Sequence, residues 1–209
     1  MKTQLSQLLS TGLEAIHLPL PDNTQDALIT YIQLLDKWNK TYNLTAIRDP
    51  IEMVSLHILD SLIIGSYLHG DHCIDIGTGP GLPGIPLALA YPDKTFVLLD
   101  SNGKKTRFLT HVQQTLGIKN ITVVQARSEE SKAPAGFDSV LSRAFASLTD
   151  MLQMTYHLCS PGGRFLAMKG QYPESELNDL PAGFTVEHVY PLTIPNLAAQ
   201  RHLIVLKAT

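Results

Sequence analysis

The stretch CIDIGTGPGLPGIPLA, from Cys73 to Ala88, contains four glycines and three prolines within an otherwise apolar run. The short run His72–Ile76 before the glycines predicts a strand, and the apolar residues Leu82–Ala90 after them predict a helix. Glycine permits unusual dihedral angles and close backbone approach, and the helix that follows points free amides at a ligand. The stretch therefore predicts a nucleotide-binding turn between a strand and a helix.

Three kinds of nucleotide-binding loop share this general pattern. A phosphate-binding P-loop requires Gly-x-x-x-x-Gly-Lys-Ser/Thr, but Ile85-Pro86 stands where the lysine and the hydroxyl residue belong. A dinucleotide-binding loop requires Gly-x-Gly-x-x-Gly, and Leu82 occupies the position of its last glycine. The third kind has Gly-x-Gly-x-Gly with an acid two residues earlier, here Gly77, Gly79 and Asp75. That pattern resembles the class I S-adenosylmethionine-dependent methyltransferases.

Two carboxylates near this loop suit that cofactor. S-adenosylmethionine carries an ammonium and a sulfonium cation in place of a pyrophosphate, so Asp75 could help to hold its cationic end. Asp100 ends the next predicted strand, where an acid can accept hydrogen bonds from a ribose diol. The alternative is that both carboxylates only cap loops or helices.

From His72 onward, short strands and helices alternate, which predicts a parallel sheet covered on both faces. No clear helix separates the last two strands, so we expect an antiparallel hairpin to complete the sheet. The expected fold is α/β and Rossmann-like, with a seven-stranded, mostly parallel sheet. We expect the strands at His72–Ile76, Thr95–Leu99, Ile121–Gln125, Ser139–Ser142, Arg164–Met168, Phe184–Tyr190 and His202–Lys207, and the helices at Leu82–Ala90, Lys104–Leu116 and Leu148–Leu158.

The first third of the chain is predicted to be helical. Apolar residues recur at helical spacing from Asp22 to Trp38, which indicates one buried face. Asp49-Pro50 has the pattern of an N-cap followed by a proline at the first helical position, so we expect a helix from there to about Leu68. Residues 1–70 are therefore expected to form a helical extension packed on a core of residues 71–209, in one compact domain.

The composition excludes several classes of protein. With 44% hydrophobic residues the chain can bury a full core, while a net charge of −3 argues against a general nucleic-acid binder. Neither a signal peptide nor a membrane-spanning apolar segment is visible. The two cysteines and the scattered histidines give no disulfide framework and no metal-binding pattern. We expect a cytoplasmic protein that needs no metal and contacts no membrane.

Short sequence motifs in and around the glycine loop make the resemblance more specific. Six of them occur in order: KWNKTYNLTAIRDP (Lys37–Pro50), HILDSL (His57–Leu62), DIGTGPGLPGIPLA (Asp75–Ala88), LLDSNGKKTRFL (Leu98–Leu109), SRAFASL (Ser142–Leu148) and MKGQ (Met168–Gln171). Together they resemble the RsmG (GidB) family of bacterial methyltransferases, which act on guanine N7 of 16S ribosomal RNA. The resemblance runs from about Asp22 to Lys207.

This resemblance implies S-adenosylmethionine as cofactor and 16S rRNA or the small ribosomal subunit as partner, and we expect the enzyme to be a monomer. It implies cofactor contacts at Gly77 and Leu82 in the loop, at Ser128 and Glu129 after the third strand, and at Arg143 after the fourth. The family often has a small residue or valine where this chain has Ser128, so a backbone contact is expected there.

The chemistry of guanine N7 fits the absence of a nucleophile. N7 has a free lone pair and no proton to lose, so its methylation needs in-line placement only. Cys73 and Cys159 are expected to be structural, and SRAF follows the fourth strand in place of the Asn/Asp-Pro-Pro-aromatic word of amine methyltransferases. No residue is assigned as an acid, a base or a nucleophile.

Three residues are candidates for the substrate side of the site. Arg143 could contact the cofactor, the RNA or a structural carboxylate, and the resemblance favours the site. Lys169 follows the fifth strand, and we expect it to contact phosphate rather than solvent alone. Phe145 is a candidate wall for the base, although a core position suits a phenylalanine equally well.

Two other classes of function remain open at this point. An RNA-binding module could keep the loop without catalysis, although the intact glycine loop argues against this. A nicotinamide-dependent oxidoreductase could use a related loop, although Leu82 replaces the last glycine of that fingerprint.

Overall fold

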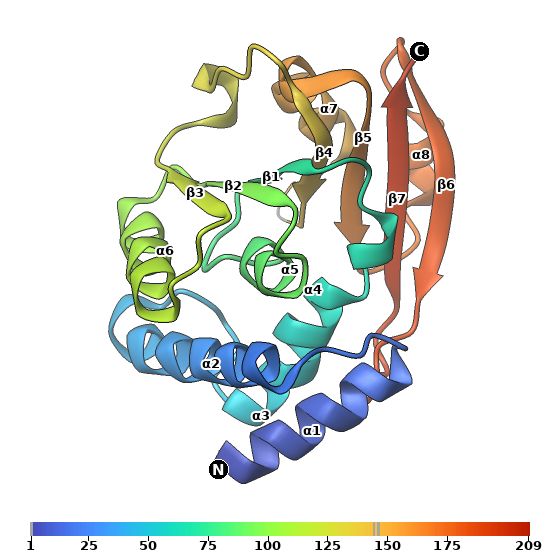
Figure 1. The fold of residues 1–209 in the computed structure, drawn as a ribbon. Helices are drawn as coiled ribbons and strands as arrows, with labels where there is room; N and C mark the ends of the chain where they lie inside the picture. Colours follow the sequence, from blue (N-terminus) through green and yellow to red (C-terminus); the bar gives the residue numbers. More distant parts are fainter. Residues whose placement is uncertain (1, 144, 146) are drawn as a thin grey trace.

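The computed structural model describes residues 2–143, 145 and 147–209. One seven-stranded sheet runs through the molecule in the order β3-β2-β1-β4-β5-β7-β6 (Figure 1). The strands are β1 His72–Ile76, β2 Thr95–Leu99, β3 Ile121–Val124, β4 Phe137–Ser142, β5 Cys159–Lys169, β6 Phe184–Leu192 and β7 Arg201–Ala208. The predicted seven strands are confirmed, although β4, β5, β6 and β7 extend beyond the predicted bounds and β3 ends one residue before its predicted end.

The first five strands are parallel, and β7 runs antiparallel to both β5 and β6. The predicted antiparallel hairpin is therefore confirmed. In this register Ile76 pairs with Leu99 on one side and with Ser142 on the other. The carboxyl ends of β1, β2 and β4 consequently meet at one edge of the sheet, which is where open α/β sheets bind ligands.

Helices cover both faces of the sheet, as predicted. The larger apolar cluster joins one face to α1 (Lys2–Ala15), α2 (Asp22–Tyr42), α5 (Gly84–Ala90) and α6 (Gly103–Leu116). The smaller cluster joins the other face to α7 (Leu148–Thr155) and α8 (Glu174–Asn178). Alternate residues of each strand supply the two clusters, because successive side chains in a strand point to opposite faces. Cys73 lies in the first cluster and Ile74 in the second.

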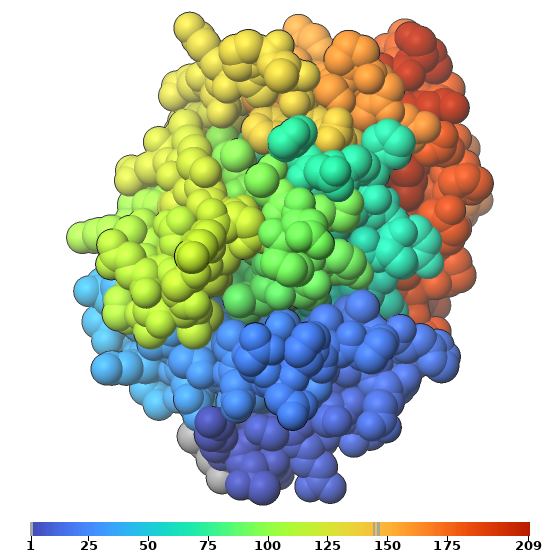
Figure 2. Space-filling view, in the orientation of Figure 1, coloured from blue at the N-terminus to red at the C-terminus, as the bar shows by residue number. Residues whose placement is uncertain are grey.

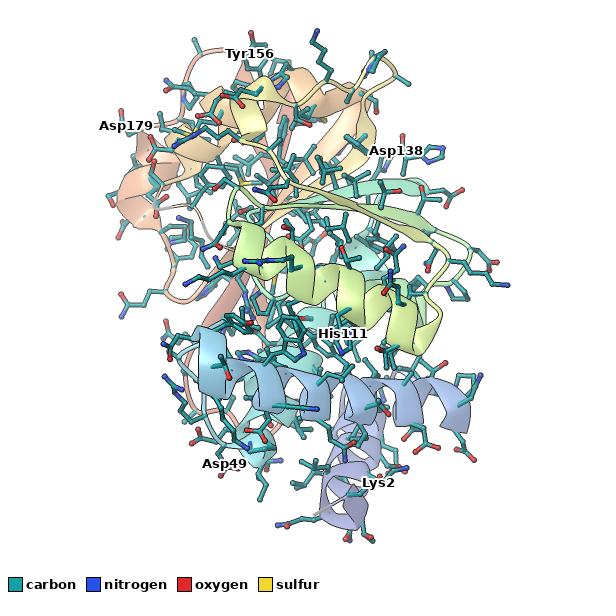
Figure 3. All side chains as sticks on the ribbon, turned by 90° about the vertical axis from the view of Figure 1, so that its left-hand side faces the viewer. Lys2, Asp49, His111, Asp138, Tyr156 and Asp179 are labelled. Carbon is teal, nitrogen blue, oxygen red and sulfur yellow. The ribbon has the colours of Figure 1, made fainter. Side chains whose placement is uncertain are left out.

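The N-terminal helices form one end of the molecule, below the sheet and α6 (Figure 2). α2 contacts both α5 and α6. Trp38 of α2 packs against Phe108 and His111 of α6, with ring centroids 5.5 and 5.2 Å apart. Figure 3 shows α6 lying above α2, with His111 at their contact. Trp38 is half-buried and packs against the larger apolar cluster, on the inward face that the helical spacing predicted.

The predicted helix from Pro50 to Leu68 is only partly correct. It begins as expected, because the Asp49 side chain accepts a hydrogen bond from the Ile51 amide at 2.9 Å. α3 (Pro50–Met53) then widens into a π-helical segment, Val54–Leu59, in which the Asp60 amide reaches the Ser55 carbonyl five residues earlier. The chain returns to α4 (Asp60–Leu62) and a 3-10 turn, Gly65–Tyr67. Apolar spacing over so few residues does not distinguish a π turn from an α turn.

Further helical segments differ from the prediction. α5 begins at Gly84, two residues after the predicted start at Leu82. α7 ends at Thr155 and continues as a 3-10 turn, Tyr156–Leu158. The five-residue α8 has no buried residue, so it gives no apolar periodicity by which to predict it. Another 3-10 turn, Ser128–Glu130, follows β3. Across the described residues, no helix combines the length and the apolar character needed to cross a membrane.

Candidate functional site

The glycine loop lies between β1 and α5 and is held by a buried carboxylate. Asp75 Oδ2 accepts hydrogen bonds from the Thr78 hydroxyl at 2.6 Å and from the Gly84 amide at 2.8 Å. A side chain at Gly84 would collide with Leu98 and would lie 2.9 Å from that carboxylate oxygen. The loop also turns through left-handed conformations, with φ of 64° at Gly77 and 62° at Gly79. These glycines allow the loop to close tightly over Asp75.

Asp75 itself lies beneath the loop and is fully buried. Burial raises the pKa of its carboxyl to about 7, although the Thr78 and Gly84 hydrogen bonds oppose the rise. Its other oxygen, Oδ1, has no hydrogen-bond partner in the part of the chain that the structure describes. The carboxyl supports the loop from below, and its contact with a cationic cofactor stays a prediction.

Asp100 joins the loop to the next strand. Its Oδ2 accepts from the Gly79 amide at 2.9 Å, and its Oδ1 accepts from the Asn102 amide at 2.8 Å. The Lys105 ammonium lies 3.5 Å from Oδ2. Because an ionised carboxylate offers about four acceptor positions, Asp100 can still accept from a ligand hydroxyl. Asp100 therefore does what one alternative expected, since it caps the glycine loop, and it also lines a cavity where it could accept from a ribose, as the other alternative expected.

This cavity, of about 360 Å³, opens at the carboxyl ends of β1, β2 and β3. The structure brings four predicted cofactor residues to it: Gly77, Asp100, Ser128 and Glu129. Its described lining consists of Ile76, Gly77, Leu99, Asp100, Ser101, Lys105, Ala126, Arg127, Ser128, Glu129, Phe145 and Met154. Among these residues, five apolar side chains stand beside six polar or charged ones, so the cavity offers a cofactor both apolar surface and hydrogen-bonding groups.

Ser128 and Glu129 interact with each other at the rim of the cavity. The Ser128 hydroxyl donates to Glu129 Oε2 at 2.9 Å. The backbone amide of Glu129 and this hydroxyl lower the pKa of the Glu129 carboxyl. Because the Ser128 hydroxyl is engaged in this way, the arrangement favours the predicted backbone contact at that position.

Gly79 and Leu82 are not among the described residues that line this cavity. Leu82 is 2% exposed and packs in the larger apolar cluster. The Gly79 amide is directed to Asp100. In the described structure these two residues hold the loop in place, and a direct cofactor contact at either one stays a prediction.

Arg143 lines a second cavity of about 360 Å³, beside the N-terminal helices. Its Nη1 donates to Asp60 Oδ2 at 3.2 Å and to the Leu56 carbonyl at 3.4 Å. The other oxygen of Asp60 accepts from Nε of Arg201 at 3.1 Å. Of the three partners considered for Arg143, the structure places a structural carboxylate against it. His57 completes this cluster on the helical side.

A third cavity borders the other two. It shares Phe145 with the cofactor-side cavity and shares Arg143, Met168 and Gly170 with the arginine-side cavity. Lys169 lines it as well, and its ammonium lies 2.9 and 3.1 Å from the two carboxylate oxygens of Glu176. Phe145 therefore stands between two cavities, and it also packs against the smaller apolar cluster, so its contact with a base stays a prediction. Phosphate contact at Lys169 stays a prediction.

Sequence reasoning missed Arg201 and the roles of Asp60 and Tyr31. Arg201 begins β7, and because β7 is antiparallel, its first residue lies at the edge where the parallel strands end. That position is a usable signal once the hairpin is predicted. The Tyr31 hydroxyl of α2 donates to the Pro80 carbonyl at 2.9 Å, which braces the glycine loop from the N-terminal helices. No local sequence pattern predicts that contact, because the two residues are 49 positions apart.

Neither cysteine is an activated thiol. Burial raises the pKa of Cys73 to about 12 and that of Cys159 to about 11. Cys73 is fully buried, as predicted, and Cys159 is half-buried at the start of β5. No group of three or more His, Cys, Asp or Glu side chains within the described ranges is placed to hold a metal ion.

Comparison with known structures shows the fold. The chain is similar to precorrin-6y C5,15-methyltransferase from Geobacter metallireducens, with a TM-score of 0.53 and 17% identity over 71% of this chain and 87% of that one. It is also similar to TYW2 from M. jannaschii, solved in complex with AdoMet, with a TM-score of 0.58 and 13% identity over 73% and 76% of the two chains. The expected fold of class I S-adenosylmethionine-dependent methyltransferases is confirmed.

Comparison with known sequences is more specific. The model of the GidB family, rRNA small subunit methyltransferase G, matches residues 24–204. The ribosomal RNA small subunit methyltransferase G of Alteromonas mediterranea is 51% identical over 99% of this chain and 98% of its own length. The protein of that name from Yersinia enterocolitica is 54% identical over 96% and 98%. On these matches, the chain belongs to the GidB family of rRNA small subunit methyltransferases.

Proposed function

We propose that this protein transfers a methyl group from S-adenosylmethionine to N7 of a guanine in the 16S rRNA of the small ribosomal subunit. One observation carries the proposal in a chain of this family. The cavity that gathers Gly77, Asp100, Ser128 and Glu129 adjoins, at Phe145, a cleft lined by Arg143 and Lys169. A cofactor site and a cationic substrate site thus share one wall.

The cofactor-side cavity fits S-adenosylmethionine in its chemistry. Ile76, Leu99 and Ala126 offer apolar surface for a purine ring, and Asp100 offers a carboxylate for a ribose diol. Ser128 and Glu129 offer backbone groups and a carboxylate at the rim. We propose that Asp75, Gly79 and Leu82 act by holding the loop that shapes this cavity. The bound cofactor supplies an electrophilic methyl group on its sulfonium.

The protein's own task is then placement. Guanine N7 has a lone pair and no proton to lose, so no general base is required, and orientation of the reacting atoms carries the rate. The raised pKa of Cys73 and of Cys159 agrees with a route without a covalent intermediate. We assign Phe145 to contact with the target base, since aromatic faces stack on unpaired bases and this one also borders the cofactor cavity.

We also propose the setting in which the enzyme works. Its substrate is 16S rRNA or the small subunit, which places the enzyme in the cytoplasm, and we expect it to act as a monomer. Residues 1–70 would serve as a helical extension packed on a catalytic core of residues 71–209. Support comes from Tyr31, which reaches the glycine loop from α2, and from Asp60, which reaches Arg143 from α4.

The decisive experiment is methylation of small subunits and of naked rRNA from a strain lacking this mark. We expect labelled methyl from S-adenosylmethionine to enter the rRNA. Reduction followed by aniline treatment should then cut the strand at one guanine, because N7-methylguanine is labile to this treatment. A protein that binds the cofactor yet labels neither substrate would contradict the proposal.

The same experiment separates the other two functions. RNA binding without any incorporation would indicate a binding module that has lost catalysis. Thermal stabilisation by NAD, but not by S-adenosylhomocysteine, would indicate a nicotinamide-dependent enzyme, because a ligand stabilises the folded state that binds it.

A further inference from the structure

One buried carboxylate holds two arginines that come from distant parts of the chain. Asp60 is 2% exposed, and its two oxygens accept separately from Arg143 Nη1 and Arg201 Nε. Arg143 follows β4, Arg201 begins β7, and Asp60 stands where the π-helical segment ends. π-helical turns are rare and are often found at functional sites. The carboxylate thus fixes two guanidinium groups on one wall of a cavity.

The charges of this cavity do not balance. Asp60 carries one negative charge, while Arg143 and Arg201 carry two positive charges, since guanidinium groups stay protonated. The remaining titratable group in the described lining is His57, and burial together with Arg143 lowers its pKa to about 4. His57 is therefore neutral at pH 7. In the adjoining cavity, Lys169 is already paired with Glu176. A surplus positive charge consequently remains beside Arg143 and Arg201.

The arginine-side cavity is separated from the cofactor-side cavity by the middle cavity. It shares Arg143, Met168 and Gly170 with the middle cavity, which in turn shares Phe145 with the cofactor-side cavity. A base placed against Phe145 would therefore lie beside the cavity that Arg143 also lines, next to the one that Arg201 lines.

We propose that Arg143 and Arg201 form a subsite for a phosphate of the RNA backbone near the target guanine, and that Asp60 is the residue that positions both arginines. The inference rests on the proposed function and adds to it the group that holds the strand. Guanidinium groups suit this task because their planar array of donors matches phosphate oxygens, and each arginine retains N–H groups that Asp60 does not occupy.

The first test compares Arg201→Gln with Arg164→Gln. Arg164 is a matched control, because it also pairs with a carboxylate, Glu187, and its side chain is 21% exposed against 24% for Arg201. It lines none of the three cavities. For Arg201→Gln we expect the KM for small subunits to rise about tenfold or more, because the RNA phosphate loses one charged hydrogen-bond partner. The Kd for S-adenosylhomocysteine should stay unchanged.

The salt dependence of RNA binding gives a readout that a purely structural role would not move. Loss of one phosphate contact should reduce the slope of log K against log salt by about 0.7 to 1. Arg164→Gln should keep the wild-type slope. An Arg201→Gln enzyme with the KM and the salt slope of Arg164→Gln would overturn the subsite.

The second test is Asp60→Asn, which removes a negative charge and leaves both arginines. If Asp60 were only a counter-charge, the added positive charge would tighten RNA binding. If it positions the arginines, kcat/KM for the subunit should fall about tenfold despite that added charge. A lower KM for the subunit with unchanged kcat would overturn the positioning role of Asp60.

The outcomes separate this inference from the proposed function. A wild-type protein that binds the cofactor but does not methylate rRNA contradicts the function itself. A wild-type protein that methylates rRNA, together with an Arg201→Gln variant equal to its control, contradicts the subsite alone. If Asp60→Asn does not fold, as circular dichroism would show, Arg201→Gln still decides the matter.

Discussion

Two buried carboxylates, Asp75 at the cofactor end of the molecule and Asp60 at the arginine end, have hydrogen-bond partners of different kinds. Asp75 accepts from a hydroxyl and a backbone amide, both neutral, and its Oδ1 is without a partner among the described residues. Asp60 accepts from two guanidinium groups. Asp75 therefore interacts with neutral dipoles, whereas Asp60 interacts with positive charges.

The difference separates two kinds of binding surface. Neutral donors hold the glycine loop without adding charge to it, and the described charged residues that line the cofactor-side cavity balance, with two acids and two bases: Asp100, Glu129, Lys105 and Arg127. Charged donors leave a positive surplus at the arginine end, which suits a polyanion. The pKa values of Asp75 at one end and of His57 at the other are shifted in opposite directions, so the two ends should respond oppositely to pH.

The largest effect is expected at the Asp75 end. Its pKa is about 7 in the folded protein against 3.8 as the ordinary value, so the folded state keeps a proton that the unfolded state loses. Stability should therefore fall as pH rises from about 4 to 7, by up to roughly 4 kcal/mol. Urea unfolding of Asp75→Asn over this range should show a much flatter dependence. The exposed Asp93→Asn is the control, and parallel curves for all three proteins would contradict the assignment.

At the arginine end the sign reverses. The pKa of His57 is about 4 in the folded protein against 6.5 ordinarily, because burial and Arg143 disfavour its charged form. The unfolded chain then takes up a proton that the folded one refuses, so stability falls as pH drops from about 6.5 to 4, by roughly 3 kcal/mol. Unfolding of His57→Gln at both pH values should lack most of this loss. The variant His188→Gln, at an exposed histidine of β6, should keep it.

The tight approach at Gly84 gives the third expected effect. Gly84→Ala places a Cβ against Leu98 and the Asp75 carboxylate, so it should destabilise the fold by about 2 kcal/mol and weaken cofactor binding. Gly103→Ala changes the first residue of α6, where the nearest atoms belong to the Gln125 side-chain amide at 3.2 Å. Calorimetry should find the stability of Gly103→Ala close to that of the wild type. Equal stabilities of the two variants would show that the glycine loop can move to accommodate a Cβ at position 84.

The smallest effect concerns the contact between α2 and the glycine loop. Tyr31→Phe removes a buried hydrogen bond to the Pro80 carbonyl, which should cost about 1 kcal/mol of stability. Tyr42, whose ring is 40% exposed, provides the control variant Tyr42→Phe. Cofactor titration of both proteins tests the coupling, because a brace of the loop should weaken binding when lost. Unchanged affinity in Tyr31→Phe would limit its role to packing.

The cofactor end was largely predictable because its signals are local. Gly77, Asp100, Ser128 and Glu129 each follow a predicted strand, and the carboxyl ends of parallel strands meet at one edge. The sheet was predictable for a similar reason, since its strands are short apolar runs bounded by turns. Asp75 was recognised by its spacing, but its burial beneath the loop depends on Gly84 and Leu98 packing around it.

The arginine end was not predictable in the same way. Asp60 and Arg201 are 141 residues apart, so no spacing rule joins them. The π-helical turn before Asp60 arises within an ordinary-looking apolar pattern, and α8 buries none of its residues. These features depend on tertiary contacts.

The position of β7 has a consequence for the order in which the protein folds. β7 follows β6 along the chain, yet it lies between β5 and β6 in the sheet. β6 therefore cannot join the sheet until β7 has been made and inserted. The cofactor cavity draws mainly on residues 76–129, which are near neighbours in sequence, whereas the arginine pair waits for this late strand. Contacts of high sequence separation form slowly. A folding chain should acquire the means to hold its cofactor before the means to hold RNA.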